Sequence, residues 1–554
     1  MFDLQPVIPS FTQLSAIAPE IILTLGMCVA LLLPLFARDL CRRNNKAITA
    51  VGMVTVLAAL FAALTDLGSP SLAGSGHAFF HGTLVIDPFS QSVKALILLF
   101  TFLVFLQFIF TGSRREIAAT DAPDYITLFL GATLGMCLMV SASNLLMMFV
   151  ALEAASFPSF GLAAFRKNSK LGPEAGLKYV LFGSVASAIM LYGLSMFYGQ
   201  YGTLDLHELA AAIAQSGPTW GLALGIFGLM IGVGFKLSAF PVHFWCPDVF
   251  EGASMEITTF LSVASKGAAV ALLLRIMFTL GAAPGMESQP GLLNGITLFV
   301  GLTGGATATW GNLAALRQDN IKRMLAYSSI GHAGYMIMGC ALVGRATYHV
   351  GDDPALATAL ASAILFYLFI YLFMNLGAFT IAGLIERAGG TLFVSNWTGF
   401  WRRNALLSLL LLVCLGSLFG FPPLGGFWGK VFIALEMWRD GAWWLVAILL
   451  TNTVISSYYY LLRPAYYMFM VQDKGQPRVV AGSRGVILAG ISALVLLLAA
   501  VPTPISRWAD GRAVMLLSLP AQQAAGNNVD VTGDKTDTLA AGGDPVHSGS
   551  VSEP

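Results

Sequence analysis

The residues best able to do chemistry in this chain are ionisable side chains that stand inside long apolar runs. They are Glu153, Lys178, Lys236, Lys266, Lys430 and Glu436, with Lys94 and Arg275 near the ends of such runs. A charge at the centre of a membrane helix costs about 2.5–3.5 kcal/mol, so it is usually retained for a function. Burial lowers the pKa of an amine and raises the pKa of a carboxyl group, and both then approach neutral pH. A line of such groups can pass protons.

Four of these residues carry the clearest signal. Glu153 has apolar residues on both sides in LLMMFVALEAASFPSF, and Lys236 and Lys266 stand among small residues that leave space for water. Lys430 lies equally deep in its own run. We expect all four to take part in proton transfer. We also expect Glu153 and Lys236 to act as a coupled ion pair, because pairing at membrane depth offsets part of each insertion cost.

The remaining candidates have a structural reading that competes with the functional one. Lys178 begins a helix near one face, and it belongs to a proton path if it reaches inward to Glu153. Lys94 and Arg275 suit packing at an interface or at a helix end. His332 lies in AYSSIGHAGYMIMG. A lone helical histidine is usually a satisfied core donor, but the serines and glycines around this one favour a relay.

Two apolar runs are interrupted by helix-breaking residues. GFKLSAFPVHFWCPDVF contains Pro241 and Pro247, and GSLFGFPPLGGFWGKVF contains Pro422 and Pro423. A proline removes a backbone donor, and this is tolerated in lipid only where protein or water satisfies the freed groups. A lysine stands within about two turns of each break, and interrupted helices in corresponding halves mark ion sites in transporters with inverted repeats. We expect Gly425, Gly426 and Gly429 to admit water beside Lys430.

These residues must be positioned by a bundle of membrane helices. Of the 554 residues, 56% are hydrophobic and 11% are charged, which is too few charges for a soluble surface. Apolar runs of membrane-spanning length predict an all-α, polytopic protein of about fourteen helices. They are expected near 17–37, 46–65, 85–111, 124–141, 143–164, 177–199, 219–240, 256–281, 291–315, 324–343, 358–385, 405–437, 441–470 and 485–503, with a short piece near 243–253.

The predicted helices divide into five regions. Residues 1–120 hold helices 1–3, 121–285 the first five-helix repeat, 286–470 the second repeat, and 471–519 helix 14. An odd number of helices per repeat inverts the second repeat relative to the first, and the breaks fall in helices 7 and 12. The polar segment 520–554 cannot repay its ordering entropy, so it is predicted to be a disordered tail.

Loop charges predict the orientation. Lys and Arg collect in cytoplasmic loops, and here nineteen of them fall in one alternating set of loops. The other set holds only Arg345 and Arg439. Both termini are therefore predicted to face the outside. The stretch 240–254 belongs to the positive set but contains no Lys or Arg, so we expect it to be partly buried in the protein.

Redox and metal chemistry have no visible motif in this chain. The six cysteines, Cys28, Cys41, Cys137, Cys246, Cys340 and Cys414, lack CxxC or metal-ligand spacing and are read as small core residues. A glycine-rich dinucleotide motif is also missing from the sequence. Any electrons are expected to travel in another subunit.

Several stretches resemble a known family. FKLSAFPVHFWCPDVFEGA (235–253), FLSVASKGAA (260–269), PEAGLKYVLFGS (173–184), NIKRMLAYSSIGHAGYM (320–336) and FPPLGGFWGK (421–430) are similar to the antiporter-like subunits of respiratory complex I. LYGLSMFYGQYGTLDL (191–206) and SSYYYLLRPAYYMF (456–469) resemble the N subunit, called subunit 2 in mitochondria and plastids, more than its L and M relatives. The resemblance spans about residues 120–470.

The resemblance implies a membrane-arm subunit that translocates protons while quinone is reduced in a neighbouring module. Glu153 and Lys236 would be the coupling pair, Lys266 would pass the proton inward, His332 would relay it, and Lys430 would be the terminal lysine. Other membrane-arm subunits and the lipid bilayer of a bacterial inner membrane would be the partners, with no nucleic acid. NADH, FMN, iron–sulfur clusters and quinone would belong to partner subunits, and both termini would be periplasmic.

Two departures and two alternatives stand beside this reading. Met255 and Glu256 occupy positions where the family usually carries Thr and Pro, so the start of helix 8 is expected to differ locally. The polar tail is longer than the family pattern. A cation/proton antiporter subunit or a subunit of a proton-pumping membrane hydrogenase would share the fold. Lysines at both breaks are poor sodium ligands and favour protons.

Overall fold

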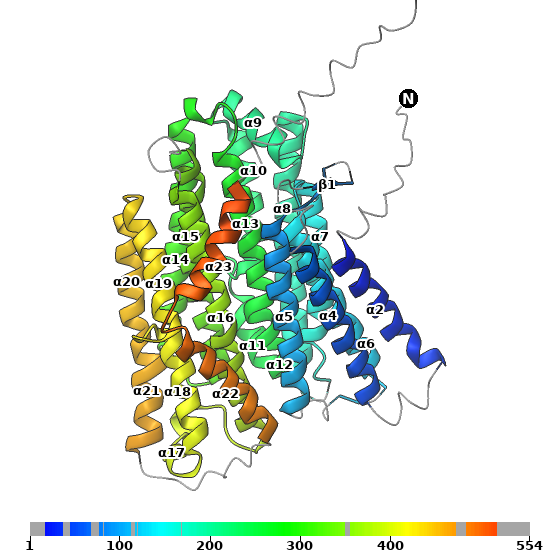
Figure 1. Cartoon of the computed structure of the whole chain (residues 1–554), viewed down its shortest axis with the longest axis vertical. Coiled ribbons are helices and arrows are strands. Elements are labelled where there is room, and N and C mark those ends of the chain that lie inside the picture. Colours follow the sequence, from blue (N-terminus) through cyan, green and yellow to red (C-terminus); the bar gives the residue numbers. More distant parts are fainter. Residues whose placement is uncertain are drawn as a thin grey trace, which may run out of the picture.

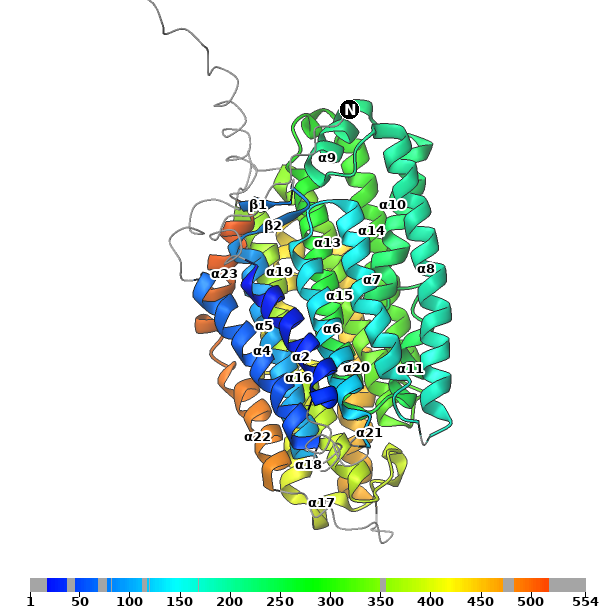
Figure 2. The same cartoon turned by 90° about the vertical axis from the view of Figure 1, so that its right-hand side faces the viewer.

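The computed structural model describes residues 17–36, 45–67, 77–80, 82–111, 117–118, 120–167, 169–348, 355–471 and 483–517. Long helices run roughly along one axis of the molecule (Figure 1). The helix α9 and the β-hairpin lie toward one end of this bundle, and α17 lies at the other, in both views (Figures 1 and 2). The tail predicted at 520–554 lies outside the described residues.

The chain begins with three helices and a short hairpin. These are α2 (Ala18–Phe36), α4 (Asn45–Leu67), β1 (His77–Phe79), β2 (Leu84–Ile86) and α5 (Pro88–Phe110). The two strands are antiparallel, with His77 opposite Ile86. Asp87 caps α5: its carboxylate accepts a hydrogen bond from the Ser90 amide, and the Ser90 hydroxyl accepts one from the Asp87 amide. This capping box satisfies two donors at the helix start.

The middle of the chain supplies the helices of the two expected repeats. The first set is α6 (Ala122–Ser141), α7 (Leu145–Ala163), α8 (Leu171–Tyr201), α9 (Leu206–Ser216), α10 (Trp220–Leu237), α11 (Trp245–Gly252), α12 (Met255–Phe260), the π-helix η2 (Leu261–Ser265) and α13 (Lys266–Gly281). The second is η3 (Met286–Ser288), α14 (Pro290–Ala315), α15 (Ile321–Tyr348), α16 (Ala355–Arg387), η5 (Val394–Asn396), α17 (Phe400–Arg403), α18 (Ala405–Phe419), α19 (Gly425–Arg439), α20 (Trp443–Ser457), η6 (Tyr458–Leu462), α21 (Arg463–Ala465) and η7 (Tyr466–Met470).

Two helices close the described chain, α22 (Ser483–Leu498) and α23 (Thr503–Leu517), and they are bent by 83° at the break between them. Within the described residues, eleven helices are long and apolar enough to cross a membrane, or twelve if this bent pair is one span. The protein is therefore a multi-pass membrane protein. The expected count of fourteen would also need α15, which is polar at its ends, and the two 15-residue halves α18 and α19.

Both predicted interruptions occur. α10 ends at Leu237, Ser238 adopts a left-handed backbone with φ of 56°, and α11 starts only at Trp245. The helix expected over 405–437 is in fact two helices, α18 and α19, separated by Gly420 at φ of 92° and by Pro422 and Pro423. The interruption expected at Pro422 and Pro423 occurs because a left-handed glycine followed by two prolines cannot continue an α-helix.

Close helix contacts hold the second set together. α14 and α15 pack along much of their length, and a Cβ atom on Gly334 would lie 2.4 Å from the backbone nitrogen of Ala308. Gly304 and Gly311 face α15 at similarly short range. Small residues let two membrane helices approach until their backbones touch. This packing fixes α15, which carries His332, against its neighbour.

Candidate proton-transfer site

The first buried lysine is held by a serine rather than by a carboxylate. Lys236 lies in the last turn of α10 and is fully buried, and its ammonium donates to the Ser156 hydroxyl of α7 at 2.9 Å. Glu153 stands one turn earlier on α7, where its carboxylate accepts a hydrogen bond from Ser187 of α8. Glu153 and Lys236 interact electrostatically, but no ion pair within 4 Å joins these two described residues. The expected direct pair is absent, because Ser156 occupies the position beside the ammonium group.

The second lysine follows a π-helical turn. Lys266 is the first residue of α13, directly after η2, and it is fully buried. Its ammonium donates to the Ser329 hydroxyl of α15 at 2.7 Å. The thiol of Cys246, from the interrupted stretch between α10 and α12, lies 3.9 Å from the same hydroxyl. Single π-turns within helices are frequent at functional sites, since they displace one side chain from the regular spacing.

His332 lies at the centre of a cluster of tyrosines. Its Nδ1 atom is hydrogen-bonded to the Tyr367 hydroxyl of α16, and its Nε2 atom lies 3.0 Å from the Tyr460 hydroxyl of η6. Tyr460 is in turn hydrogen-bonded to Ser328. A histidine with a hydroxyl on each ring nitrogen can accept a proton on one side and give one up on the other.

Lys430 is held by the end of the broken helix. Its ammonium donates to the carbonyl oxygens of Leu418 at 3.1 Å and Phe419 at 2.8 Å, the last residues of α18. It also lies 5.1 Å from the ring centre of Tyr335. The terminal carbonyls of a helix have no partner within that helix and carry partial negative charge, so they attract a cation.

The sequence suggested that the glycines near Lys430 make room for water, but the structure shows that they do not. A Cβ atom on Gly426 would lie 1.8 Å from the Ser417 carbonyl oxygen, and one on Gly429 would lie 2.4 Å from the Tyr367 ring. A Cβ on Gly425 would meet Ala499 at 2.8 Å. The space beside all three is filled by neighbouring atoms. They are needed for close packing of α19, which brings Lys430 to the α18 carbonyls.

α15 connects the second lysine to the last one. Ser329, His332 and Tyr335 recur every three residues and so share one face of this helix. Ser329 binds Lys266, and the ring of Tyr335 lies against Lys430. The order along this face is therefore Lys266, His332 and Lys430. No hydrogen bond joins Lys236 to Lys266, although both residues are described.

Lys178 lies outside this line. Its ammonium forms ion pairs of 2.8 Å with Glu174 and with Asp248 of α11, and its side chain is 38% exposed. Arg323 continues the network, because it binds Asp248 at 2.8 Å and Glu251 at 2.7 Å. Lys178 therefore pairs with Glu174 and Asp248 and not with Glu153. The stretch 240–254 is partly buried, as expected: Trp245 and Phe250 are buried, and its carboxylates are paired with cations from α8 and α15.

The other ionisable candidates form ion pairs. Lys94 is fully buried and lies 2.6 Å from Glu20, and Arg275 lies 2.9 Å from the helix-capping Asp87. Glu436 pairs with Arg439 at 3.0 Å. These contacts agree with the packing interpretation of Lys94 and Arg275. The attraction between the two charges of such a pair offsets part of the cost of burying them.

Sequence reasoning missed the hydroxyl groups that bind Lys236, Lys266 and His332. Ser156, Ser329, Tyr367 and Tyr460 each contact one of the predicted residues. The signal was partly visible, since Ser329 stands in the same motif as His332 and Tyr460 lies in SSYYYLLR. Hydroxyls bound to a backbone carbonyl are common in helices, so composition alone does not identify the ones that also bind a lysine.

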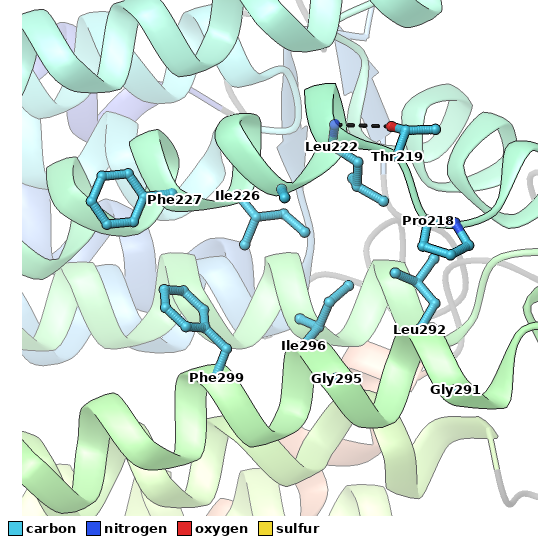
Figure 3. A pocket seen from close by; sticks show the side chains of 11 residues that line it. Pro218, Thr219, Leu222, Ile226, Phe227, Gly291, Leu292, Gly295, Ile296 and Phe299 are labelled. Atoms are coloured by element: carbon cyan, nitrogen blue, oxygen red, sulfur yellow. Dashed lines mark hydrogen bonds between the residues drawn. The ribbon is translucent and has the colours of Figure 1, made fainter.

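A separate apolar groove lies between α10 and α14 (Figure 3). Its volume is about 480 Å³, and its lining includes Leu222, Phe227, Ile296 and Phe299. Thr219 at one end is uncharged, and its hydroxyl accepts a hydrogen bond from the Leu222 amide at 3.1 Å. None of the lining residues is ionisable, so the groove suits hydrocarbon and is not part of the proton-transfer site. Among the described residues, no three His, Cys, Asp or Glu side chains gather to hold a metal.

The fold and the site define a class: a polytopic membrane subunit with broken helices and a buried line of lysines joined by a histidine. The profile of the family described as "NADH:quinone oxidoreductase/Mrp antiporter, TM" matches residues 142–456. A relative from Anaeromyxobacter sp. (strain Fw109-5), named NADH-quinone oxidoreductase subunit N, is 35% identical over 519 residues, which cover 89% of this chain and 95% of that relative. The chain belongs to this NADH:quinone oxidoreductase and Mrp antiporter family.

Solved structures agree. A chain of respiratory complex I from Thermus thermophilus matches with a TM-score of 0.69 and 31% identity, covering 88% of this chain and 98% of that one. A chain of the Mrp complex from Dietzia sp. DQ12-45-1b matches with a TM-score of 0.76 and 19% identity, covering 92% and 99%. The second likeness concerns the fold alone.

Proposed function

We propose that this chain is the proton-translocating N-type subunit in the membrane arm of an NADH–quinone oxidoreductase. It moves protons through Glu153, Lys236, Lys266, His332 and Lys430 while quinone is reduced in another subunit. The observation that carries the proposal is the face of α15 on which Ser329, His332 and Tyr335 join Lys266 to Lys430.

The partners of the three lysines support a transfer role. Lys236 and Lys266 are bound by serine hydroxyls, and Lys430 is bound by carbonyls. A hydroxyl both donates and accepts, so it can hydrogen-bond to an amine with or without its extra proton. Lys94 and Arg275 differ, because each faces a carboxylate within 3 Å. Lys178 has the same kind of partner, so we assign it to the network at the mouth of the path.

The alternatives of the same fold are less well supported. Fold alone does not separate an oxidoreductase subunit from a cation/proton antiporter or a hydrogenase subunit. The relative of 35% identity carries the name of the N subunit, whereas the Mrp structure is only 19% identical. Lysines at both broken helices favour protons over sodium, because an ammonium group cannot ligate a cation.

We further propose fourteen spans in two inverted repeats, with both termini in the periplasm. The count follows if the bent pair α22–α23, α15 and the broken pair α18–α19 each cross once, in addition to the eleven long apolar helices. NADH, FMN, iron–sulfur clusters and quinone would bind partner subunits, and the protein would sit in the bacterial inner membrane among other membrane-arm subunits.

Replacing Glu153 or Lys236 with Ala tests the proposal. Each variant should assemble but lower the rate of proton uptake by about tenfold or more, since a positioned transfer group contributes about 10²–10⁴ in rate. The measurement is NADH-driven proton uptake by sealed inside-out vesicles that contain the assembled complex. Lys167→Ala is the control, because its ammonium binds Asp121 at an exposed site. If both variants pump as fast as the control, the path is wrong.

A further inference from the structure

A buried carboxylate lies at the start of α12, which continues through η2 into α13 and Lys266 as one membrane span. Glu256 is the second residue of α12 and is 1% exposed. The Thr111 hydroxyl, just after α5, donates to its carboxylate at 3.3 Å. The proton path described above does not use Glu256.

A buried lysine accompanies this carboxylate. Lys322 is the second residue of α15, is 1% exposed, and donates from its ammonium to the Ala253 carbonyl oxygen at 2.6 Å. It interacts electrostatically with Glu256. The other charges that face it are Glu386 of α16, Glu251 of α11 and Arg166. Glu256 and Lys322 are thus two buried groups of opposite charge at the starts of α12 and α15.

The helical segments that begin near Glu256 and Lys322 also carry the next pair of buried polar residues, Lys266 and Ser329. On α15, Lys322 precedes Ser329 by seven residues, a rise of about 10 Å. On the other helix, Lys266 follows Glu256 by ten residues. Ser329 binds Lys266, so this hydrogen bond connects the same two helical segments that carry Glu256 and Lys322. Glu256 and Lys322 lie nearer the starts of those segments. Arg323, next to Lys322, ties this end of α15 to the exposed charge network.

Hydroxyl groups fill the interval. Thr259 and Ser262 follow Glu256 at steps of three residues, which keeps them on one face, and Lys266 follows four residues later. Both hydroxyls are fully buried and donate to backbone carbonyls of their own helix at 2.7 Å. Their lone pairs remain able to accept a proton. Each step is about 5 Å, a distance that one water molecule bridges.

We propose that Glu256 and Lys322 form a proton-loading site for Lys266, with Thr259 and Ser262 as the steps between them. The Glu256 carboxylate takes a proton from water on the side of the charge network and becomes a carboxylic acid. It then passes a proton along the hydroxyls to the amine of Lys266, which becomes an ammonium, and Glu256 returns to the carboxylate. Lys322 is a positioning residue: its ammonium binds the Ala253 carbonyl just before α12, and its positive charge stabilises the Glu256 carboxylate. The inference rests on the proposed function.

The test compares three variants in sealed inside-out vesicles with the assembled complex. Glu256→Gln keeps the shape but cannot carry a proton, so proton uptake should fall about tenfold, and Glu256→Asp should restore most of it. Thr259→Val removes one hydroxyl without a change of shape, and it should slow uptake and raise the solvent deuterium isotope effect. This milder variant decides the matter if Glu256→Gln does not assemble. Lys167→Ala is again the control, since its ammonium binds Asp121 at an exposed site.

A purely structural Glu256 gives a different result. Assembly would then fall in Glu256→Gln while proton uptake per assembled complex and the isotope effect stayed at the control values, and this would overturn the loading site. The proposed function is tested separately by Lys236→Ala. If that variant is impaired while Glu256→Gln and Thr259→Val pump normally, only the loading site is wrong.

Discussion

At the scale of single residues, the partners of a buried lysine distinguish its role. Lys236, Lys266 and Lys430 are bound by hydroxyls or carbonyls, whereas Lys94 is bound by Glu20. All four are buried, and the sequence presents them in similar apolar runs. A buried ion pair is costly to break because it leaves the other charge unpaired. A neutral partner carries no such penalty when the amine changes its protonation.

Lys430→Arg is the sharpest single-residue test of this distinction. Arg keeps the positive charge and can still donate to the α18 carbonyls, so the subunit should assemble. Its guanidinium stays protonated, so it cannot accept and release a proton. We expect proton uptake to fall about tenfold or more in vesicles, while the amount of assembled complex is unchanged. An Arg variant that pumps fully would mean that Lys430 is only an anchor for the broken helix.

The candidate residues could be predicted from the sequence, but the groups that bind them in the structure could not. The depth of Lys236 and Lys266 in their apolar runs was enough to single them out, and both are fully buried. The direction of a side chain on its helix depends on which helices pack beside it. Lys178 therefore turned to Asp248 rather than to Glu153. Gly426 was expected beside water and instead lies against the Ser417 carbonyl.

At the scale of elements, the two broken helices satisfy their freed carbonyls with side chains. The Trp245 indole donates to the Phe235 carbonyl at the end of α10, at 3.0 Å. Lys430 does the same for Leu418 and Phe419 at the end of α18. Non-helical backbone at membrane depth persists only when its polar groups are satisfied in this way. The breaks were predictable from Pro241, Pro422 and Pro423.

Long apolar helices were predictable and short polar ones were not. The bounds expected for 291–315 and 256–281 agree with α14 and with α12 to α13 within one residue. The hairpin, α9 and α23 were missed, because they are too short or too polar to give a membrane-length run. α9 is an eleven-residue helix capped by Asp205, a local signal that hydropathy does not record.

The bent pair α22–α23 leads to a prediction about orientation. The start of α2 and the end of α23 both lie toward the end of the molecule that carries α9 (Figures 1 and 2). If this end is periplasmic, a fluorescent reporter fused after residue 520 should stay dark when it folds only in the cytoplasm. Fusion after Gln318, between α14 and α15, is the bright control. A bright fusion at 520 would reverse the predicted topology.

At the scale of the whole molecule, charges sort by end. Arg345 and Arg439, the two basic residues counted in the other set of loops, are paired with carboxylates: Arg345 with Asp440 and Arg439 with Glu436. Cations of the positive set, such as Arg166 and Arg463, are paired with carboxylates as well, so the predicted orientation depends on the count of Lys and Arg in each set of loops. The charge network around Asp248 belongs to α11, which directly follows the first helix break, and a proton path would open there.

The two halves of the molecule meet along α15. This helix belongs to the second set, yet Ser329 binds Lys266 of the first set, and Arg323 binds Asp248 of α11. His332 then binds Tyr367 of α16, and the ring of Tyr335 lies against Lys430 of the second broken helix. Among the described residues, the contacts that lead from the first set of helices to Lys430 run along this shared face, which makes Lys266 the residue on which the account depends.

The most direct measurement is the number of protons translocated per electron transferred when Lys266 is replaced by Ala. The assembled oxidoreductase is held in sealed inside-out vesicles, and NADH oxidation and proton uptake are recorded together. We predict that the complex assembles and still oxidises NADH, while the ratio of protons to electrons falls clearly below that of the unaltered complex. An unchanged ratio in a fully assembled Lys266→Ala complex would contradict the claim that this chain moves protons along its buried lysines.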